Sequence, residues 1–454
     1  MSYKKSEPRL IVQNSMVENT ETFSNTLKLN ENAASYNLDI KMHPSGKFDV
    51  MAIIQVTNKS SESWKEILFY LIPNMYTEKN KPESIPGASE LKIGKITVNG
   101  AETSYDLYKD TLKINLKSKL APRNHAEVRV RYSFTLPEEG KRFAIRNGNF
   151  YLAEWYPMLV TYRSGWEKEE YNFFGESYHT DYSDFKVQLE LPSEDYLVAS
   201  TADTETYEQV KKKLFKTSRV KEFYIAIMKE TFVKKKNING TEIRLIGNKV
   251  DESFGDQYLE TAIKGFSFFE KHLGDYPYKQ LDIIMNGDGM EYPGIVTVGT
   301  GAINEHVVIH EVAHQWFYGL VSNNPYHTAF VDEGLTNFAT YLYFILEGNN
   351  KPEEVFSDAN ASVQKAKETN TMQHSNLRLS EFDPNGYMAA VYETPALRLW
   401  ELSKRPDKAL EYLRTYFQTY KYSEVDTQEW VRFTKSYFNI DDDDPLKPWI
   451  EFGE

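Results

Sequence analysis

The sequence contains His310-Glu311-Val312-Ala313-His314 within a segment whose apolar residues recur at helical spacing. At positions i and i+4, two imidazoles lie on one face of a helix, one turn apart, and this suits two corners of a tetrahedral Zn²⁺ site. Glu311 is adjacent and can reach a water molecule as general base. The alternative is an ordinary helix with one exposed histidine and one buried, hydrogen-bonded histidine. The motif alone does not separate these two interpretations.

A catalytic zinc usually has three protein ligands and one open position, so a third ligand is expected nearby. Glu333 follows His314 after eighteen intervening residues and opens the next helical segment, 336–347. Two consecutive antiparallel helices would bring the start of the second against the middle of the first. Glu333 can also serve the helix dipole as an N-terminal carboxylate. We therefore predict that His310, His314 and Glu333 bind one Zn²⁺ per chain.

This combination of His-Glu-x-x-His, eighteen residues and Glu resembles the signature of the gluzincin zinc aminopeptidases, the aminopeptidase N and leukotriene-hydrolase family. The family has an upstream Gly-x-Met-Glu-Asn loop whose glutamate holds the α-amine of the substrate. Gly289-Met290-Glu291 is similar to that loop, and the resemblance implies that Glu291 binds the amine. Asp288 and Tyr292 stand where the family pattern has Gly and Asn. The alternative for Glu291 is an exposed carboxylate beside a Pro-Gly turn.

The family also has a downstream Tyr-Glu-Lys-Gly segment whose tyrosine polarises the scissile carbonyl. Here the segment 391–397 looks like it, which implies that role for Tyr392, with Tyr387 as the competing residue. Lys-Gly is replaced by Thr394-Pro395, which predicts an N-cap and a helix beginning at Pro395. In the family, a second amine-binding residue usually comes from the N-terminal domain, where Glu154 is a candidate.

The hydrophobic period divides the chain. Residues 1–33 are polar and predict an N-terminal arm, and residues 34–235 alternate with period two, which predicts an antiparallel, sandwich-like β domain. Residues 236–454 show one buried-strand pattern at 281–285 and then mainly helical spacing. The resemblance implies that this part is a thermolysin-like catalytic domain, so the fold class is multidomain α+β. Helices are predicted near 304–318, 332–347, 353–368, 395–404, 407–421 and 427–437.

Composition excludes several other classes. With 53 Lys and Arg against 66 Asp and Glu, the net charge is −13, which argues against a general binder of nucleic acid or anionic membranes. The absence of cysteine excludes a disulfide scaffold, a thiol nucleophile and a Cys-ligated metal. No run approaches 18 apolar residues, and the N-terminus has no signal-peptide core. The chain as given is therefore expected to be cytoplasmic, or extracellular or membrane-anchored if an upstream segment was removed.

These observations predict a zinc metallopeptidase of the hydrolase class that removes N-terminal residues from peptides with a free N-terminus. The resemblance implies Glu311 and Tyr392 as catalytic residues, with the substrate in a groove between the two domains. It also implies a short family member that lacks the large helical C-terminal domain. One alternative is a zinc endopeptidase in which the Tyr292 loop no longer binds the amine. A second is a non-catalytic interaction protein that retains the fold.

Overall fold

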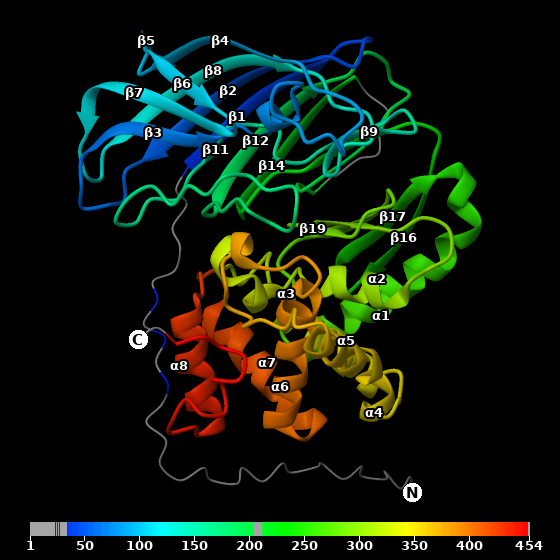
Figure 1. Ribbon diagram of the computed structural model, residues 1–454. Helices are drawn as coiled ribbons and strands as arrows, with labels where there is room; N and C mark the ends of the chain where they lie inside the picture. Colours follow the sequence, from blue (N-terminus) through cyan, green and yellow to red (C-terminus); the bar gives the residue numbers. More distant parts are fainter. Residues whose placement is uncertain (1–22, 24, 26, 28–33, 204–210, 453–454) are drawn as a thin grey trace, which may run out of the picture.

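The structure is a computed structural model that describes residues 23, 25, 27, 34–203 and 211–452. The predicted N-terminal arm over residues 1–33 lies outside the described residues, apart from Phe23, Asn25 and Leu27. Figure 1 shows a β-rich part from the first half of the chain above a mainly helical part, with a smaller sheet between them. The multidomain α+β class predicted from the sequence is confirmed.

A seven-stranded sheet forms the largest layer of the β-rich part. Its strands are, in spatial order, β14 (Lys212–Val220), β12 (Ser183–Glu190), β1 (Ala34–Met42), β2 (Phe48–Thr57), β8 (His125–Phe134), β4 (Leu91–Val98) and β5 (Ala101–Glu102). All neighbours are antiparallel except β1 and β12, which run parallel with Ala34 opposite Ser183. The predicted antiparallel sheet is thus correct for five of six pairings. Phe185, Val187 and Leu189 are buried while Lys186 and Gln188 are exposed, as the alternation predicts.

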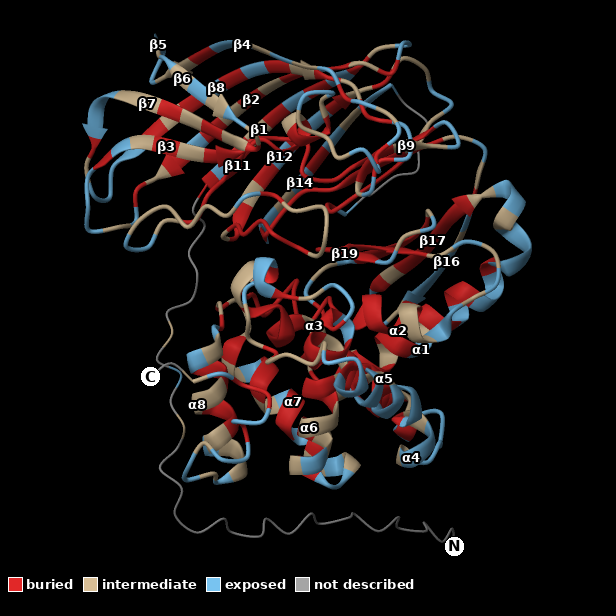
Figure 2. Ribbon diagram, viewed as in Figure 1, coloured by how far each residue is buried: buried red, intermediate tan, exposed pale blue. Residues whose placement is uncertain are grey.

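Two four-stranded sheets complete this part. One comprises β11 (Met158–Leu159), β3 (Trp64–Tyr70), β7 (Thr111–Leu120) and β6 (Tyr105–Tyr108). The other comprises β13 (Leu197–Ser200), β15 (Ile225–Met228), β10 (Asn149–Leu152) and β9 (Phe143–Arg146), and a 3₁₀ turn, η1, spans Ile72–Tyr76. Leu38 and Val128 of the large sheet share one hydrophobic core with Ile67 and Leu112 of the first small sheet. Figure 2 shows this buried interior, which is the packing of a sandwich.

The second part begins with a five-stranded sheet. Its order is β16 (Thr231–Ile238), β17 (Thr241–Asn248), β18 (Gln280–Met285), β20 (Ile295–Val298) and β19 (Met290–Tyr292). Every residue of β18 is buried, because β18 lies between parallel neighbours β17 and β20. The strand predicted at 281–285 is confirmed. The hairpin between β16 and β17 turns at Asn239 and Gly240, both with positive φ, as the Asn-Gly pair predicts.

The predicted domain division at 235/236 falls inside β16. A division there would cut a strand of the five-stranded sheet, whereas a division before Thr231 keeps the sheet whole. The sequence signal does not mark this change of sheet, because β16 is itself a strand that follows other strands. The division into domains itself stays a prediction.

Helices cover the five-stranded sheet and build the rest of this part. They are η2 (Lys249–Phe254), α1 (Gly255–His272), α2 (Glu305–Ala313), α3 (Pro325–Leu346), α4 (Pro352–Val355), α5 (Ser357–Glu368), η3 (Leu379–Glu381), η4 (Ala389–Glu393), α6 (Thr394–Ser403), α7 (Pro406–Tyr420) and α8 (Thr427–Phe438). Gly265 of α1 lets α2 approach closely, since a Cβ at Gly265 would lie 2.7 Å from Cδ1 of Ile309. This contact fixes the helix that carries the histidine motif.

Two helix boundaries differ from the prediction in ways that matter for the site. Helix α2 ends at Ala313, and residues 314–320 continue as turns. Helix α3 begins at Pro325 rather than near 332, because Asn324 caps its N-terminus with a side-chain bond to the Tyr326 amide. The backbone of α3 is non-helical at Thr328, where two helical stretches meet, so Glu333 lies about one turn beyond this kink.

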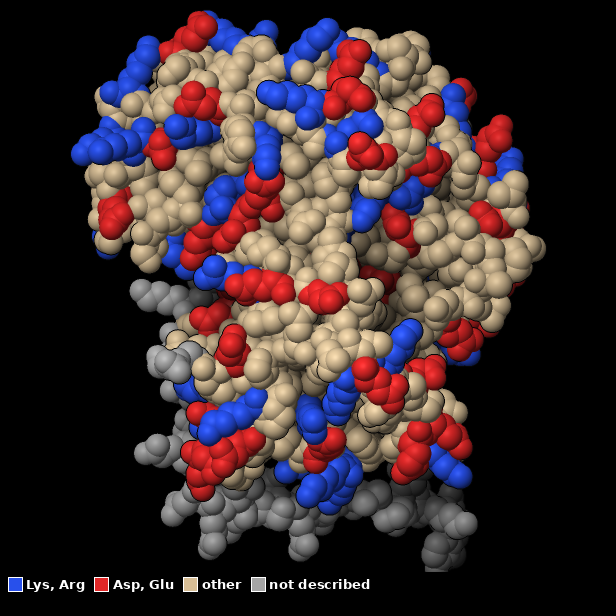
Figure 3. All heavy atoms as spheres, in the orientation of Figure 1, with Lys and Arg blue, Asp and Glu red and all other residues tan. Residues whose placement is uncertain are grey.

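Charged side chains are interspersed on the face of the molecule that Figure 3 shows, with Lys and Arg lying among Asp and Glu. Within the part of the chain that the structure describes, none of the helices combines the length and apolar character that crossing a membrane requires.

Candidate active site

Three side-chain atoms from α2, its C-cap and α3 converge on one point. Nε2 of His310 lies 3.0 Å from Nε2 of His314, and Oε2 of Glu333 lies 3.2 Å and 3.1 Å from these two nitrogens. His310 and His314 face the same way because they are one helical turn apart. Thr336 Oγ1 lies 3.2 Å from Nδ1 of His314, and this contact turns the opposite ring nitrogen toward Glu333.

These donors fit a zinc ion. Zn–N and Zn–O bonds of about 2.0–2.1 Å at tetrahedral angles place neighbouring ligand atoms roughly 3.3–3.4 Å apart, close to the observed separations. Burial lowers the pKa of His310 to about 4, so its imidazole is in the neutral form that binds metals. Burial alone would raise the pKa of the Glu333 carboxyl, but its contacts with His310 and His314 hold that pKa below the usual range. The three residues can therefore offer a metal ion two imidazole nitrogens and one carboxylate oxygen.

One oxygen of the Glu311 carboxylate has no hydrogen-bond partner. Its Oε2 is buried and accepts no hydrogen bond, while Oε1 lies 2.8 Å from the place of a Cβ at Gly289. The missing side chain at Gly289 is thus what lets the carboxylate fit beneath the loop. Burial raises the pKa of Glu311 to about 8. The arrangement provides a proton acceptor directly beside the metal donors.

Glu291 lies on β19 and is only 4% exposed, so the alternative of an exposed turn carboxylate is wrong. One of its oxygens is within 4.8 Å of ligand atoms of both Glu311 and His314. Gln315, which follows His314, fixes the position of this strand. Its Nε2 donates to the carbonyl of Tyr292 at 3.0 Å, and its Oε1 accepts the amide of Gly294 at 2.9 Å. The histidine motif and the Glu291 loop are therefore joined directly.

The two departures from the family loop both contact the β-rich part. Tyr292 stacks on Tyr224 with ring centroids 4.3 Å apart and planes at 19°. Asp288 accepts a hydrogen bond from Nη2 of Arg146 at 2.7 Å, and Nη1 of the same arginine bonds the carbonyl of Asn286. Tyr292 and Asp288 thus anchor the loop that carries Glu291 against the β-rich part.

Sequence reasoning missed a second carboxylate in the cleft, Glu176, and its partner Arg142. Nη1 of Arg142 donates to Oε1 of Glu176 at 2.9 Å, and Nη2 bonds the carbonyl of Gly175. Glu176 is one of the charges that, after burial, raise the pKa of Glu291 well above its usual value. Glu154, the predicted candidate from this part, does not line the cleft, and its carboxylate is buried 3.9 Å from Arg142.

Tyr392 contacts two of the predicted metal ligands directly. Its hydroxyl donates to Oε1 of Glu333 at 2.5 Å, and its ring lies 5.9 Å from the His310 ring. Tyr387 also lines the cleft, but it packs edge-on against Phe174 at 4.8 Å. The predicted N-cap at Thr394 is wrong. Thr394 is helical, its hydroxyl donates to the carbonyl of Ala389 at 2.7 Å, and Tyr392 lies in the π-helical turn η4.

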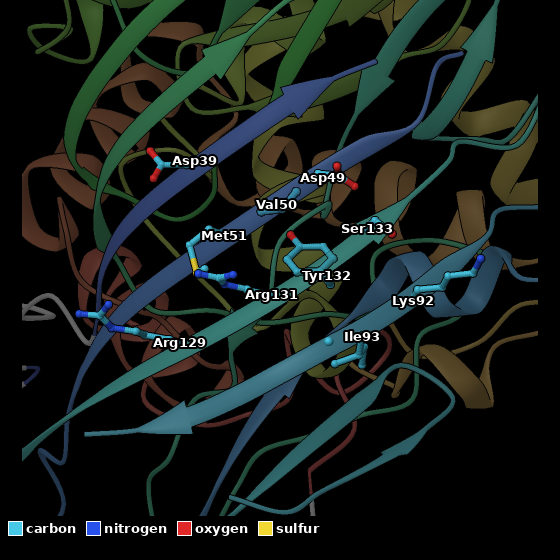
Figure 4. Close-up of a pocket in the computed structure, with 11 residues that line it drawn as sticks. Asp39, Asp49, Val50, Met51, Lys92, Ile93, Arg129, Arg131, Tyr132 and Ser133 are labelled. Atoms are coloured by element: carbon cyan, nitrogen blue, oxygen red, sulfur yellow. The ribbon is translucent and has the colours of Figure 1, made fainter. Parts of the chain in front are cut away.

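One cleft of about 480 Å³ lies between the two parts of the molecule, and its lining includes His310, His314, Glu333, Glu311, Glu291 and Tyr392. The β-rich part supplies Arg142, Phe174, Gly175 and Glu176, and the other part supplies the remaining walls. This agrees with the predicted groove between domains. A wider hollow of about 790 Å³ lies on β1, β2, β4 and β8 and shares no lining residue with the cleft. Figure 4 shows its charged side chains spread apart, with Lys92 and Arg129 at opposite ends.

Residues 257–443 match the family model described as Peptidase family M1 domain. This range includes Glu291, His310, Glu311, His314, Glu333 and Tyr392. This part of the chain is therefore similar to the peptidase family M1 domain, which agrees with the gluzincin aminopeptidase resemblance predicted from the motifs. The M1 family implies zinc as the metal.

Among curated proteins, the chain is similar to leukotriene A-4 hydrolase of Xenopus laevis, with 25% identity over 231 residues, covering 44% of this chain and 37% of the relative. It is also similar to aminopeptidase M1-A of Oryza sativa subsp. japonica, with 28% identity over 193 residues, covering 37% of this chain and 22% of the relative. The chain thus spans less than two fifths of the length of these relatives.

Solved structures show the same fold over nearly the whole chain. The M1 zinc metallopeptidase of Deinococcus radiodurans is 17% identical with a TM-score of 0.65, and the match covers 93% of this chain and 95% of that one. A two-domain M1 zinc metallopeptidase bound to L-tryptophan is 15% identical with a TM-score of 0.67, covering 93% and 96%. The two-domain architecture is therefore shared with these metallopeptidases.

Proposed function

We propose that the chain is a zinc-dependent aminopeptidase that hydrolyses the first peptide bond of peptides with a free N-terminus. One observation carries the proposal: the donors His310, His314 and Glu333 share a cleft with the buried carboxylates Glu291, Glu176 and Glu311. The donors suit a metal-assisted hydrolysis, and the cluster of carboxyl groups suits a substrate that brings a cation, because a nearby cation favours their ionised forms. The family match supports the same class of reaction.

His310, His314 and Glu333 would hold one Zn²⁺ per chain. When bound, the ion polarises the peptide carbonyl and lowers the pKa of a water molecule. Glu311 takes the proton of the attacking water on its unpartnered Oε2 and passes it to the leaving amine.

Tyr392 donates its phenolic hydrogen bond to the oxygen of the tetrahedral intermediate. A donor that acts mainly when negative charge develops lowers the barrier more than it strengthens substrate binding. The hydroxyl is already within hydrogen-bond distance of the Glu333 carboxylate, so it lies beside the atoms that would hold the metal.

Glu291 and Glu176 set the position of cleavage by pairing with the α-ammonium group. Both are buried, at 4% and 7% exposure, and a buried carboxylate is stabilised by a nearby cation. Arg142 neutralises part of Glu176, which leaves Glu291 as the principal partner of the amine. With the amine held there, the first peptide bond is the one that reaches Glu311 and the metal donors.

The test compares aminoacyl-nitroanilides with their N-acetylated forms. We expect the acetylated substrates to be cleaved slower by about 30-fold or more, since removing one member of a desolvated charge pair costs roughly 2–5 kcal/mol. Glu291→Ala should slow cleavage of the free substrate and shrink this difference. Glu260→Gln, an exposed position on α1, serves as the control and should keep the full rate difference between free and acetylated substrates.

Three outcomes separate the alternatives. Equal rates on free and acetylated substrates would favour the endopeptidase alternative. Zinc binding without hydrolysis of any peptide would favour the non-catalytic alternative. Loss of cleavage in Glu291→Ala with no change in the ratio of free to acetylated rates would remove Glu291 as the amine-binding residue.

A further inference from the structure

The turn that carries Tyr392 departs from ordinary helix geometry. Residues Ala389–Glu393 form a π-helical turn that continues directly into α6. Pro395 explains this, because proline has no N–H to donate and its ring excludes the carbonyl four residues earlier, here that of Val391. Pro395 also packs on α3, where a Cβ at Gly334 would lie 2.7 Å from the proline Cβ. The widened turn leaves carbonyl groups that need other donors.

Asn337 of α3 supplies one of these donors. Its Nδ2 lies 3.2 Å from the backbone carbonyl of Tyr392 and 3.1 Å from Oε2 of Glu393, and it donates to both. Asn337 is one helical turn beyond Glu333, so the two side chains lie on the same face of α3. Asn337 is buried beside the cleft, and both bonds are partly buried.

The same side chain also reaches the helix of the histidine motif. Oδ1 of Asn337 lies 3.0 Å from Nε2 of His306, which is one turn before His310 on α2. Because the amide oxygen can only accept, His306 donates through Nε2. Tyr341 completes the cluster by donating to Oε2 of Glu393 at 2.6 Å. Asn337 therefore joins α2, α3 and the Tyr392 turn through one amide group.

We propose that Asn337 is a positioning residue that sets the place of the Tyr392 phenol relative to His310, His314 and Glu333. Asn337 acts through the main chain of Tyr392 and through Glu393. The proposal rests on the role of Tyr392 given above. A side chain that only stabilised the fold would affect the enzyme in the same way whether or not Tyr392 had its hydroxyl.

A double-mutant cycle tests this on the zinc-loaded full chain with an aminoacyl-nitroanilide. Asn337→Ala should lower kcat by about 5- to 10-fold, the effect of one neutral hydrogen bond, with KM changed by less than about 2-fold. In the Tyr392→Phe background the same substitution should change kcat by less than about 2-fold, because the group being positioned has lost its hydroxyl. The control is Asn360→Ala on α5, which loses a comparable bond to the Phe356 carbonyl at 2.8 Å and should leave kcat unchanged.

Zinc content and the unfolding midpoint are measured for every variant. If Asn337→Ala does not fold, Asn337→Leu carries the same test, since leucine is close to asparagine in shape and has no donor for the Tyr392 carbonyl. The inference is overturned if Asn337→Ala leaves kcat unchanged, or if it slows the Tyr392→Phe enzyme as much as the wild type. If Tyr392→Phe itself leaves kcat unchanged, the role of Tyr392 in the proposed function fails, and the inference fails with it for that separate reason.

Discussion

Tyr392 and Glu333 share a hydrogen bond in which the phenol donates to Oε1, while Oε2 of the same carboxylate faces the imidazoles of His310 and His314. Burial, and then the charge of Glu333, raises the pKa of Tyr392 well above its usual value. The phenol therefore keeps its proton at neutral pH and remains a donor. To stabilise a substrate oxygen, the phenol must give up its hydrogen bond to Glu333 and donate to that oxygen instead.

The first prediction concerns the metal. The wild-type protein should contain about one zinc per chain, since three donors and one open position complete a single tetrahedral site. His310→Ala or His314→Ala should lose zinc and activity together while the β-rich part stays folded, as measured by elemental analysis and circular dichroism. His125→Ala, an exposed histidine on β8, is the control. Full zinc content and activity in either variant would remove this site.

Glu311→Gln should retain zinc and lose turnover. The amide is close in shape to the carboxylate but cannot accept the proton of water, and general-base catalysis contributes about 10²- to 10⁴-fold. Glu305→Gln, in the first turn of the same helix and exposed, is the matched control and should behave as wild type. A Glu311→Gln enzyme within tenfold of the wild-type kcat would show that another group accepts the proton.

Tyr392→Phe should lower kcat and kcat/KM in parallel with little change in KM, because its bond to the oxyanion forms only in the transition state. The loss of one such donor costs roughly 3 kcal/mol, or about 10²-fold. Tyr387→Phe should have a much smaller effect, since that ring packs against Phe174 and Phe382. If the two variants show the reverse pattern, the assignment belongs to Tyr387.

The local parts of this site were predictable because they follow from helix geometry. His310 and His314 must share a face at i and i+4, whatever the rest of the chain does. The place of Tyr392 was inferred from a motif, but its π-helical turn was not, because Thr394-Pro395 was interpreted as the start of a helix, whereas the helical turn before it continues through these residues. The start of α3 was also missed, although Asn324-Pro325 is a recognisable cap.

The contribution of the β-rich part could not be predicted from one sequence. Glu176 and Arg142 lie in loops without a strong period, and they meet Glu291 only because the two parts of the molecule face each other across the cleft. Glu154 belongs to the same polar region but points into the protein, beyond Arg142. Spacing along the chain does not distinguish a carboxylate that lines a cleft from one buried behind it.

The last prediction concerns Glu154 and pH. Its side chain is fully buried, neither carboxylate oxygen has a hydrogen-bond partner, and burial raises its pKa to about 8 from a usual value of 4.5. Between these two pH values the folded protein retains a proton that the unfolded chain has released. The free energy of unfolding must therefore fall as pH rises through this window. Glu154→Gln removes the titrating group, so its stability relative to wild type should increase from pH 5 to pH 8.

The measurement is the free energy of unfolding of wild type and Glu154→Gln at several pH values. The difference should grow by an amount on the order of 2–4 kcal/mol, because each unit of pKa shift is worth about 1.4 kcal/mol. Glu222, whose pKa burial raises to about 7, titrates in both proteins, and its charge adds to the raised pKa of Glu154. The exposed Glu260→Gln should show no trend with pH. A constant difference between wild type and Glu154→Gln would mean that Glu154 is ionised in the folded protein and that its charge is balanced by Arg142 across 3.9 Å.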